Sequence, residues 1–169
     1  MPTIRIPLNS RKYPGLYALI DEADFELVSQ YQWYPSWCNG KLYAAAYGGG
    51  GRAHPQTLRM HRLVTGAAKG QQVDHVNGDG TDNRRCNLRL STQSQNMANI
   101  RKLAGTSRYK GVHWDQDRGK WMARVRIGGI AKNLGRFDCE EDAAVAYDDA
   151  AYREFGEFAH LNFPEEVMA

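Results

Sequence analysis

Cysteine is scarce in this chain of 169 residues. Cys38, Cys86 and Cys139 stand far apart, and none of them belongs to a C-x-x-C pair. This spacing argues against a disulfide framework and against a cysteine-based zinc site. It favours three buried or partly buried thiols in a protein that works in a reducing compartment.

Long apolar runs and targeting signals are missing as well. No stretch approaches the roughly 20 apolar residues that a membrane helix needs. The first residues, Met1 to Arg5, contain no apolar signal core. We therefore expect a soluble, cytoplasmic protein with no membrane partner. No heptad pattern or long apolar seam requires a dimer, so we expect a monomer.

The glycine run Gly48 to Gly51 is the one segment that superficially suggests a nucleotide-binding loop. No Lys-Ser/Thr follows it, and no strand–helix frame surrounds it, so we exclude a phosphate-binding loop. We expect no small-molecule cofactor.

Charge is distributed unevenly, although the net charge is only +3. Residues 102–136 carry nine Lys/Arg against two Asp, a net of +7. Residues 137–157 carry one Arg against eight acidic residues, a net of −7. Such an abrupt switch indicates one basic surface that faces a polyanion and one acidic surface that faces away from it.

Hydrophobic periodicity and turn signals divide the chain into three regions, 1–58, 59–103 and 108–164. The spacings Thr92–Gln95 and Asp138–Glu141 fit capping boxes at helix starts. The predicted elements, in chain order, are strand 16–20, helix 21–34, strand 41–47, strand 57–60, helix 61–65, strand 71–75, strand 88–90, helix 92–102, strands 109–114, 120–127 and 130–137, and a helix from Asp138 to Gly156.

Polar residues of the second region are placed to meet in one pocket. Asp74-His75 ends a strand, Asn87 begins the next strand, and Asn96 lies in the first turn of the following helix. The oxygens of Asp74 and Asn96 suit a hard divalent cation. His75, with an ordinary pKa near 6.5, can take a proton from water. The set predicts phosphodiester hydrolysis with one Mg²⁺ or Mn²⁺ per site. A structural histidine at a strand end is the alternative for His75.

The segments around these positions strengthen that prediction. They are MHRLV (60–64), VDHVNGD (73–79), DNRRCNLRL (82–90), and Thr92 with Gln95-Asn96. Together they closely resemble the HNH homing endonuclease family. The resemblance implies a ββα-metal fold in which Asp74 and Asn96 hold the divalent ion, His75 is the general base, and Asn87 orients His75 near the scissile phosphate. Asn96 stands where many relatives have His. For His61 we favour a packing or hydrogen-bonding role.

The third region resembles a second family, the AP2 domain, over about residues 108–164. The matching segments are YKGVHW (109–114), GKWMARVR (119–126), LGRF (134–137), EDAAVAYD (141–148) and LNFP (161–164). The resemblance implies a three-stranded antiparallel sheet, backed by one helix, that reads the DNA major groove. His113 stands where an Arg is common and the first turn is one residue longer, so base preference does not carry over.

Strand alternation places Lys120, Met122, Arg124 and Arg126 on one face of this sheet. By the same alternation Trp121 faces the helix. In the alternative arrangement, which the AP2 resemblance suggests, the aromatic residue at this position faces DNA. The sequence therefore leaves the orientation of Trp121 undecided. For Arg84, Arg85 and Arg89 a solvated surface charge is the alternative to a phosphate contact. The candidate DNA contacts are Arg84, Arg85, Arg89, Lys110, His113, Trp114, Arg118, Lys120, Arg124, Arg126 and Lys132.

Taken together, the patterns predict an α+β fold. A small mixed N-terminal region and a ββα-metal HNH core precede a three-stranded antiparallel sheet packed on one helix. We expect a metal-dependent endonuclease of the homing or phage mobile-element type, acting on double-stranded DNA. The alternative is a non-catalytic DNA-binding regulator with a silent HNH fold, and the intact set of Asp74, His75, Asn87 and Asn96 argues against it.

Overall fold

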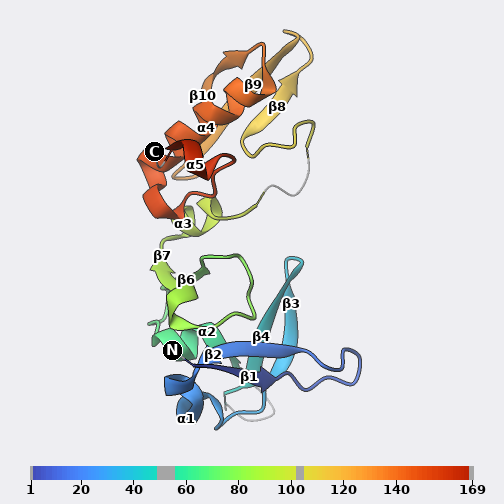
Figure 1. Cartoon of the computed structure of the whole chain (residues 1–169), viewed down its shortest axis with the longest axis vertical. Coiled ribbons are helices and arrows are strands. Elements are labelled where there is room, and N and C mark those ends of the chain that lie inside the picture. The colour runs from blue at the N-terminus through green and yellow to red at the C-terminus, as the bar shows by residue number, and fades with distance from the viewer. Residues whose placement is uncertain (1, 49–55, 102–104, 168–169) are drawn as a thin grey trace. The chain divides into compact units, whose positions relative to one another are not determined.

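The computed structural model describes residues 2–48, 56–101 and 105–167 (Figure 1). It is a mixed α+β structure with several small antiparallel sheets, as the sequence predicts. The chain forms two compact units, Met1–Ser91 and Thr92–Ala169. The predicted division into three functional regions stays a prediction.

Small antiparallel sheets make up most of the first unit. Its strands are β1 (Thr3–Pro7) paired with β2 (Tyr17–Asp21), β3 (Tyr34–Cys38), β4 (Lys41–Tyr47) and β5 (Thr57–Arg59) in one sheet, and β6 (Gln72–His75) paired with β7 (Leu88–Ser91). The helical segments are η1 (Glu22–Asp24), α1 (Phe25–Val28), α2 (Met60–Thr65) and η2 (Arg85–Asn87).

The core of the first unit draws on almost all of these elements. Alternate residues of β2 and β4 point inward, as period-two strands require. They pack with the buried face of α2 in one cluster, which consists of Ile6, Leu8, Ala18, Ile20, Val28, Trp33, Ala44, Ala46, Met60 and Val64. Residues from both the predicted first and second regions share this cluster, so the β6–β7 hairpin rests on a scaffold that begins near the N-terminus.

The predicted helix at 21–34 is wrong in length. Helical structure ends at Val28, and β3 already begins at Tyr34. Trp33 explains the early end, because its indole nitrogen donates a hydrogen bond to the carbonyl of Val28 at 2.8 Å and its ring is 2% exposed. Burying this large ring turns the chain back onto the helix end, and packing overrides the helical period.

The second unit is a three-stranded sheet with helices. The sheet order is β10-β9-β8, with all neighbours antiparallel. The elements are α3 (Gln93–Ala98), β8 (Val112–Asp115), β9 (Lys120–Ile127), β10 (Ile130–Phe137), α4 (Glu140–Phe155), η3 (Gly156–Phe158) and α5 (Pro164–Val167).

Helix α4 covers one face of this sheet. Ala143, Ala144 and Ala151 of α4 are fully buried and share clusters with Ala123 and Val125 of β9. Small side chains at these helix positions allow a close approach to the strands, which buries apolar surface on both elements. Asp142, Asp149 and Glu154 of α4 are exposed, in keeping with the predicted charge switch, whereas Asp148 is fully buried and accepts hydrogen bonds from Asn162 and from the backbone N–H of Phe163.

The helix starts are partly as predicted. Thr92 and Gln95 form the capping box of α3 with both reciprocal hydrogen bonds. At α4 the predicted cap is wrong: Cys139 occupies the N-cap position and makes no side-chain capping bond. Asp138 instead pairs with Lys120, with 3.1 Å between its Oδ1 and Nζ.

Helix α3 ends at Ala98, earlier than the predicted Lys102, which lies outside the described residues. The carbonyl of Ala98 accepts hydrogen bonds from the ammonium of Lys110 and from the backbone N–H of His160. Both donors come from the second unit, so they satisfy the helix end and tie α3 to that unit.

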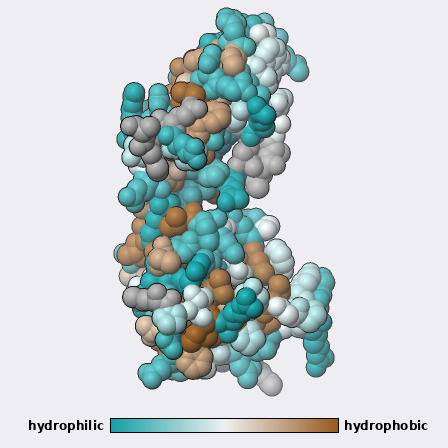
Figure 2. Space-filling view, viewed as in Figure 1, coloured by the Kyte–Doolittle hydropathy of each residue, from teal (hydrophilic) through white to brown (hydrophobic). Residues whose placement is uncertain are grey.

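None of the described helices combines the length and apolar character that crossing a membrane would require. On the face shown in Figure 2, hydrophobic residues lie as separate spots among hydrophilic ones. The largest fully buried apolar side chains are those of Trp33, Ile20 and Met60 in the first core. The prediction of buried or partly buried thiols is wrong, because Cys38, Cys86 and Cys139 are all exposed.

Candidate active site

Asp74 and His75 close strand β6 beside β7. The register places Asp74 opposite Arg89 and His75 opposite Leu88. Both polar side chains are buried, with 4% of Asp74 and 6% of His75 exposed. Burial of a carboxylate and an imidazole is unfavourable unless each has partners, so their neighbours decide what the pair can do.

The carboxylate of Asp74 is held by Arg89. Its Oδ2 atom accepts hydrogen bonds from Nε of Arg89 at 2.9 Å and from Nη2 at 2.8 Å. The Arg89 side chain is itself only 17% exposed. Arg89 is a predicted DNA contact, but in this structure its guanidinium is directed at Asp74.

His75 lies in a cluster of rings with His61 of α2 and Tyr43 of β4. Its ring centroid is 5.1 Å from that of His61 and 6.0 Å from that of Tyr43. Its Nε2 is 3.4 Å from Oδ1 of the fully buried Asn83. Burial lowers the pKa of His75, while the Asn83 contact and the charge of Asp74 oppose that change. The imidazole is therefore neutral at pH 7, which is the form that takes a proton.

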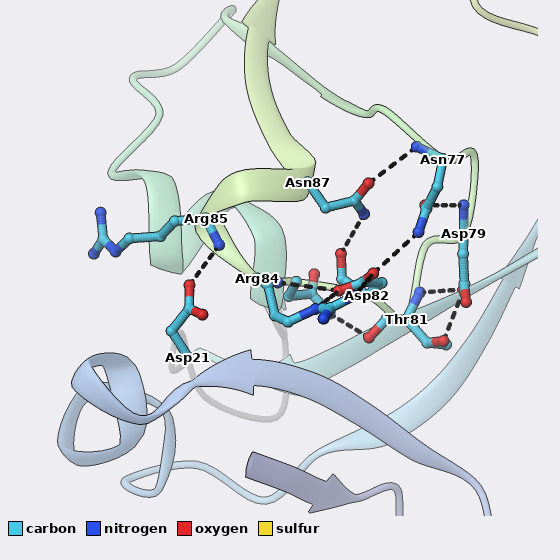
Figure 3. A network of polar contacts seen from close by, with 9 residues as sticks. Asp21, Asn77, Asp79, Thr81, Asp82, Arg84, Arg85 and Asn87 are labelled. Atoms are coloured by element: carbon cyan, nitrogen blue, oxygen red, sulfur yellow. Dashed lines mark hydrogen bonds and ion pairs between the residues drawn. The ribbon is translucent and has the colours of Figure 1, made fainter. Parts of the chain in front are cut away.

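Asn87 holds the loop between β6 and β7 (Figure 3). Its Oδ1 accepts from the backbone N–H of Asn77 at 2.9 Å, and its Nδ2 donates to the carbonyl of Asp82 at 2.8 Å. Both ends of the amide are thus engaged within the loop. The loop contains Asn83, the partner of His75, so the geometry gives Asn87 an indirect route to the imidazole.

The same loop is fixed internally and against β4. One carboxylate oxygen of Asp79 accepts hydrogen bonds from the backbone N–H and from the hydroxyl of Thr81. At Gly80 an added Cβ would lie 2.4 Å from the carbonyl oxygen of Leu42 and 2.6 Å from the Tyr43 ring. Only glycine permits this approach, which presses the loop against the ring that contacts His75.

Arg84 and Arg85, both predicted DNA contacts, are paired with aspartates. Nε and Nη2 of Arg84 contact the two carboxylate oxygens of Asp82 at 2.8 and 2.7 Å, and the hydrogen bond from Arg84 lowers the pKa of Asp82. Arg85 pairs with Asp24 at 2.6 Å, and its backbone N–H donates to Asp21 at 2.8 Å. Two N-terminal aspartates therefore anchor the segment that leads into β7.

Asn96, the second predicted metal ligand, lies in α3 and is half-buried. It belongs to the second compact unit, whereas Asp74 belongs to the first. Their pairing around a metal stays a prediction. The described residues contain no cluster of three or more His, Cys, Asp or Glu side chains suited to a metal, so a site here would depend on the mixed set of one carboxylate and one amide.

The sheet face opposite α4 carries exposed cations. Arg124 and Arg126 of β9 are exposed, while Ala123 and Val125 between and before them are buried towards α4. His113 of β8 pairs with Met122 and so shares the outer face. Over the described residues, no hydrogen bond or ion pair engages the guanidinium groups of this outer arginine pair (Arg124 and Arg126), which leaves them available to a ligand.

Two of the other predicted contacts are engaged internally. The ammonium of Lys110 donates to the carbonyl of Ala98, and burial lowers the pKa of Lys110 to about 8. Lys120 is paired with Asp138 at 3.1 Å. Their predicted DNA contacts would require these interactions to be given up, at least in part.

None of the remaining three lies on the outer face with the arginine pair. Trp114 pairs with Trp121, and their rings make an edge-to-face contact at 5.0 Å. Trp121 packs on the cluster beneath α4, so the structure places both tryptophans on the helix side. Lys132 is opposite Val125 and shares that side, although it is exposed. Arg118 lies exposed in the turn before β9.

Sequence reasoning missed several residues that build the site. Tyr43 and Asn83 contact His75, and Asp21 and Asp24 anchor the β7 segment. Asn83 had the clearest signal, because it lies within the matching segment at 82–90. The two N-terminal aspartates resemble ordinary acids of a first helical turn, and nothing local indicates their partners 64 and 61 residues away.

Comparison with known proteins agrees with this geometry. The pattern of the HNH endonuclease family matches residues 59–98. The chain is 31% identical over 155 residues to the uncharacterized HNH endonuclease L560 of Acanthamoeba polyphaga mimivirus, covering 88% of this chain and 75% of that protein. This chain belongs to the HNH endonuclease family. The family resemblance expected from the sequence is thereby confirmed, and the catalytic assignments within it stay predictions.

The C-terminal part of this HNH family member also has plant relatives. It is 46% identical over 63 residues to the dehydration-responsive element-binding protein 2D of Arabidopsis thaliana, and 41% identical over 85 residues to the AP2-like ethylene-responsive transcription factor PLT2 of the same plant. The matches span 36% and 45% of this chain but only 30% and 15% of those proteins. They confirm the AP2 resemblance of this part.

Proposed function

We propose that this protein is a metal-dependent DNA endonuclease of the homing or phage mobile-element type, which hydrolyses phosphodiester bonds and recognises double-stranded DNA through its AP2-like sheet. The observation that carries the proposal is the buried Asp74–His75 pair at the end of β6, with an imidazole kept neutral by burial. Membership of the HNH endonuclease family supports it.

His75 acts as the general base. Its neutral ring takes a proton from the attacking water, and the ring contacts with His61 and Tyr43 restrict its orientation. Proton transfer by a positioned side chain typically contributes about 10²–10⁴-fold in rate. Asn87 is a positioning residue, because it fixes the loop that carries Asn83.

Asp74 and Asn96 would hold one Mg²⁺ or Mn²⁺. A carboxylate and an amide oxygen are the donors that such hard cations prefer, so the residues fit the ion chemically. When bound, the cation supplies positive charge for the phosphate and for the leaving oxygen. Arg89 already contacts Oδ2 of Asp74 and holds that carboxylate in place.

The second unit supplies DNA recognition. The outer arginine pair projects from the sheet face opposite α4 without an acidic partner among the described residues. Arg recognises phosphates and guanine edges through its fork of donors. The similarity to AP2-domain transcription factors supports this assignment.

Cleavage of a supercoiled plasmid by the pure full-length chain tests the proposal. We expect cutting with Mg²⁺ or Mn²⁺ and none with a chelator. A monomer with one site breaks one strand at a time, so nicked circles should precede linear DNA. His75→Ala should slow cutting by about 10²–10⁴-fold with little loss of DNA affinity. Binding without cutting in either metal would instead favour a non-catalytic DNA-binding protein.

A further inference from the structure

The catalytic unit has fewer available positive charges than its sequence suggests. A phosphodiester at the active site is an anion, and its cleavage adds negative charge that a nearby cation stabilises. Yet Arg84, Arg85 and Arg89 are each paired with an aspartate at 2.6 to 2.8 Å. Their charges are therefore compensated within the protein.

Arg59, the last residue of β5, is different. Its Nη1 is buried and has no hydrogen-bond partner, and no acidic group pairs with its guanidinium in the part of the chain that the structure describes. Arg59 is opposite Ala45, two residues from Tyr43, so it shares a sheet face with Tyr43. Its guanidinium carbon lies 5.6 Å from the centre of the Tyr43 ring.

This arginine adjoins the candidate base. The Tyr43 ring that it contacts is 5.8 Å from His61 and 6.0 Å from His75. Burial lowers the pKa of His61 to about 3, and the charges of His75 and Arg59 add to that effect. Nδ1 of His61 is also buried without a partner. The described residues contain three buried side-chain nitrogen or oxygen atoms without a hydrogen-bond partner. Two of these three, Nη1 of Arg59 and Nδ1 of His61, thus lie in the ring cluster around His75.

Buried polar atoms normally have partners, and no acidic group among the described residues balances the charge of the half-buried Arg59. We propose that Arg59 binds a phosphate of the cleaved DNA strand beside His75, with Tyr43 as the surface on which the guanidinium lies. The inference rests on the proposed nuclease function. It identifies Arg59, the first residue of the family match at 59–98, as a catalytic residue in addition to the candidate set of Asp74, His75, Asn87 and Asn96. The planar fork of arginine suits a phosphate better than a point charge does.

Arg59→Met and Arg59→Lys test this proposal in the full-length chain. Met keeps an apolar stem against Tyr43 but removes the charge, and Lys keeps the charge but removes the fork. Arg5→Met is the matched control, because Arg5 is exposed and lies 4.6 Å from the ring of Tyr17, in a similar stacking contact. Each variant is measured for thermal unfolding, DNA affinity in chelator, and single-turnover cleavage at saturating protein with Mg²⁺.

For Arg59→Met we expect cleavage at saturation to fall by about 10²-fold, the size of effect seen when one charge-stabilising donor is removed. Affinity should fall much less, and the salt slope of log K should drop by about 0.9, one phosphate contact. Arg59→Lys should recover part of the rate. The melting temperature without DNA should stay equal to the parent's or rise, because a charge without an acidic partner and a buried nitrogen without a hydrogen bond have been removed. Arg5→Met should cut at the parental rate once saturated.

A saturated cleavage rate for Arg59→Met equal to the parent's would overturn the proposal. So would a clear loss of melting temperature or failure to fold in Arg59→Met, since either result assigns Arg59 to packing on Tyr43. If the parent itself cuts no DNA with either metal, the proposed nuclease function is wrong. The affinity measurements still test whether Arg59 contacts a phosphate. An unchanged salt slope in Arg59→Met would then reject the phosphate contact.

Discussion

Replacing Asn87 by Ala should weaken the loop that supports the candidate base. The change removes hydrogen bonds of 2.9 and 2.8 Å made by a side chain that is 6% exposed. Each such bond contributes about 0.5–1.5 kcal/mol, and a buried group left unpaired costs about 1–3 kcal/mol. The carbonyl of Asp82, a residue that is 3% exposed, loses this donor. We expect the free energy of unfolding of the first unit to fall by about 2–4 kcal/mol.

Urea denaturation measures that loss. Asn9→Ala is the matched control, because Asn9 is an exposed asparagine of the same unit. Its replacement should change the free energy of unfolding by less than about 0.5 kcal/mol. An Asn87→Ala protein as stable as the parent would show that the two hydrogen bonds do not secure the loop.

A double-mutant cycle then tests whether Asn87 affects cleavage through the loop. The Asp82 carboxylate binds Arg84 and the side chain of Asn77, so Asp82→Ala disturbs the same loop by another route. If both residues act through the loop, the double variant should lose less rate than the product of the single losses, with a coupling of about 0.5–3 kcal/mol. Rate losses that simply multiply would refute the reasoning and indicate that Asn87 contacts the substrate directly.

Three further perturbations test other parts of the molecule. The single-turnover cleavage rate should rise with pH as His75 loses its proton. Because burial lowers the pKa of this base, the rate should reach half of its plateau below pH 6.5, and a midpoint above about 6.5 would contradict the assignment. Replacing the outer arginine pair by Ala should weaken duplex binding and reduce its salt slope by about 1.8, two phosphate contacts, whereas Lys132→Ala, on the other face, should change binding little; equal losses would show that the face does not matter. Gly111→Ala should lower the free energy of unfolding of the second unit by about 1–3 kcal/mol more than Gly128→Ala does. Both glycines have positive φ, but only at Gly111 would a Cβ lie 2.0 Å from the Tyr147 ring, so equal melting temperatures of the two variants would disprove this tight contact.

Local patterns predicted two of the three strands of the second unit residue by residue, whereas the strand expected at 109–114 is the shorter β8, Val112–Asp115. Strands 120–127 and 130–137 were expected and are the bounds of β9 and β10. Alternating side chains and glycine-rich turns encode both ends of each strand, so little long-range information is needed. The orientation of Trp121 was not predicted, because period-two alternation does not determine the sheet face of a residue next to a turn. Packing against the Val112–Ala123 cluster resolves it towards α4.

The location of the candidate site was predictable, but its contacts were less so. Motif spacing located Asp74, His75 and Asn87 in one hairpin, and the structure places them there. Motif spacing did not predict that Arg89 pairs with Asp74, or that Arg85 pairs with Asp24. Residue type reveals a charge, but whether the charge is available depends on a partner brought close by the fold. Pairs of this kind need the tertiary structure.

The pairing of charges distinguishes the two units of the molecule. In the first unit the arginines at 84, 85 and 89 are neutralised by aspartates and stabilise the hairpin and its loop. Counterion release depends on cations that are free to meet phosphates. The paired arginines should contribute little to it, whereas the exposed outer arginine pair should contribute directly. Charge-driven affinity should therefore come mainly from the second unit, and the first should act through a few positioned groups. This is why His75→Ala should abolish most cutting while leaving binding nearly intact.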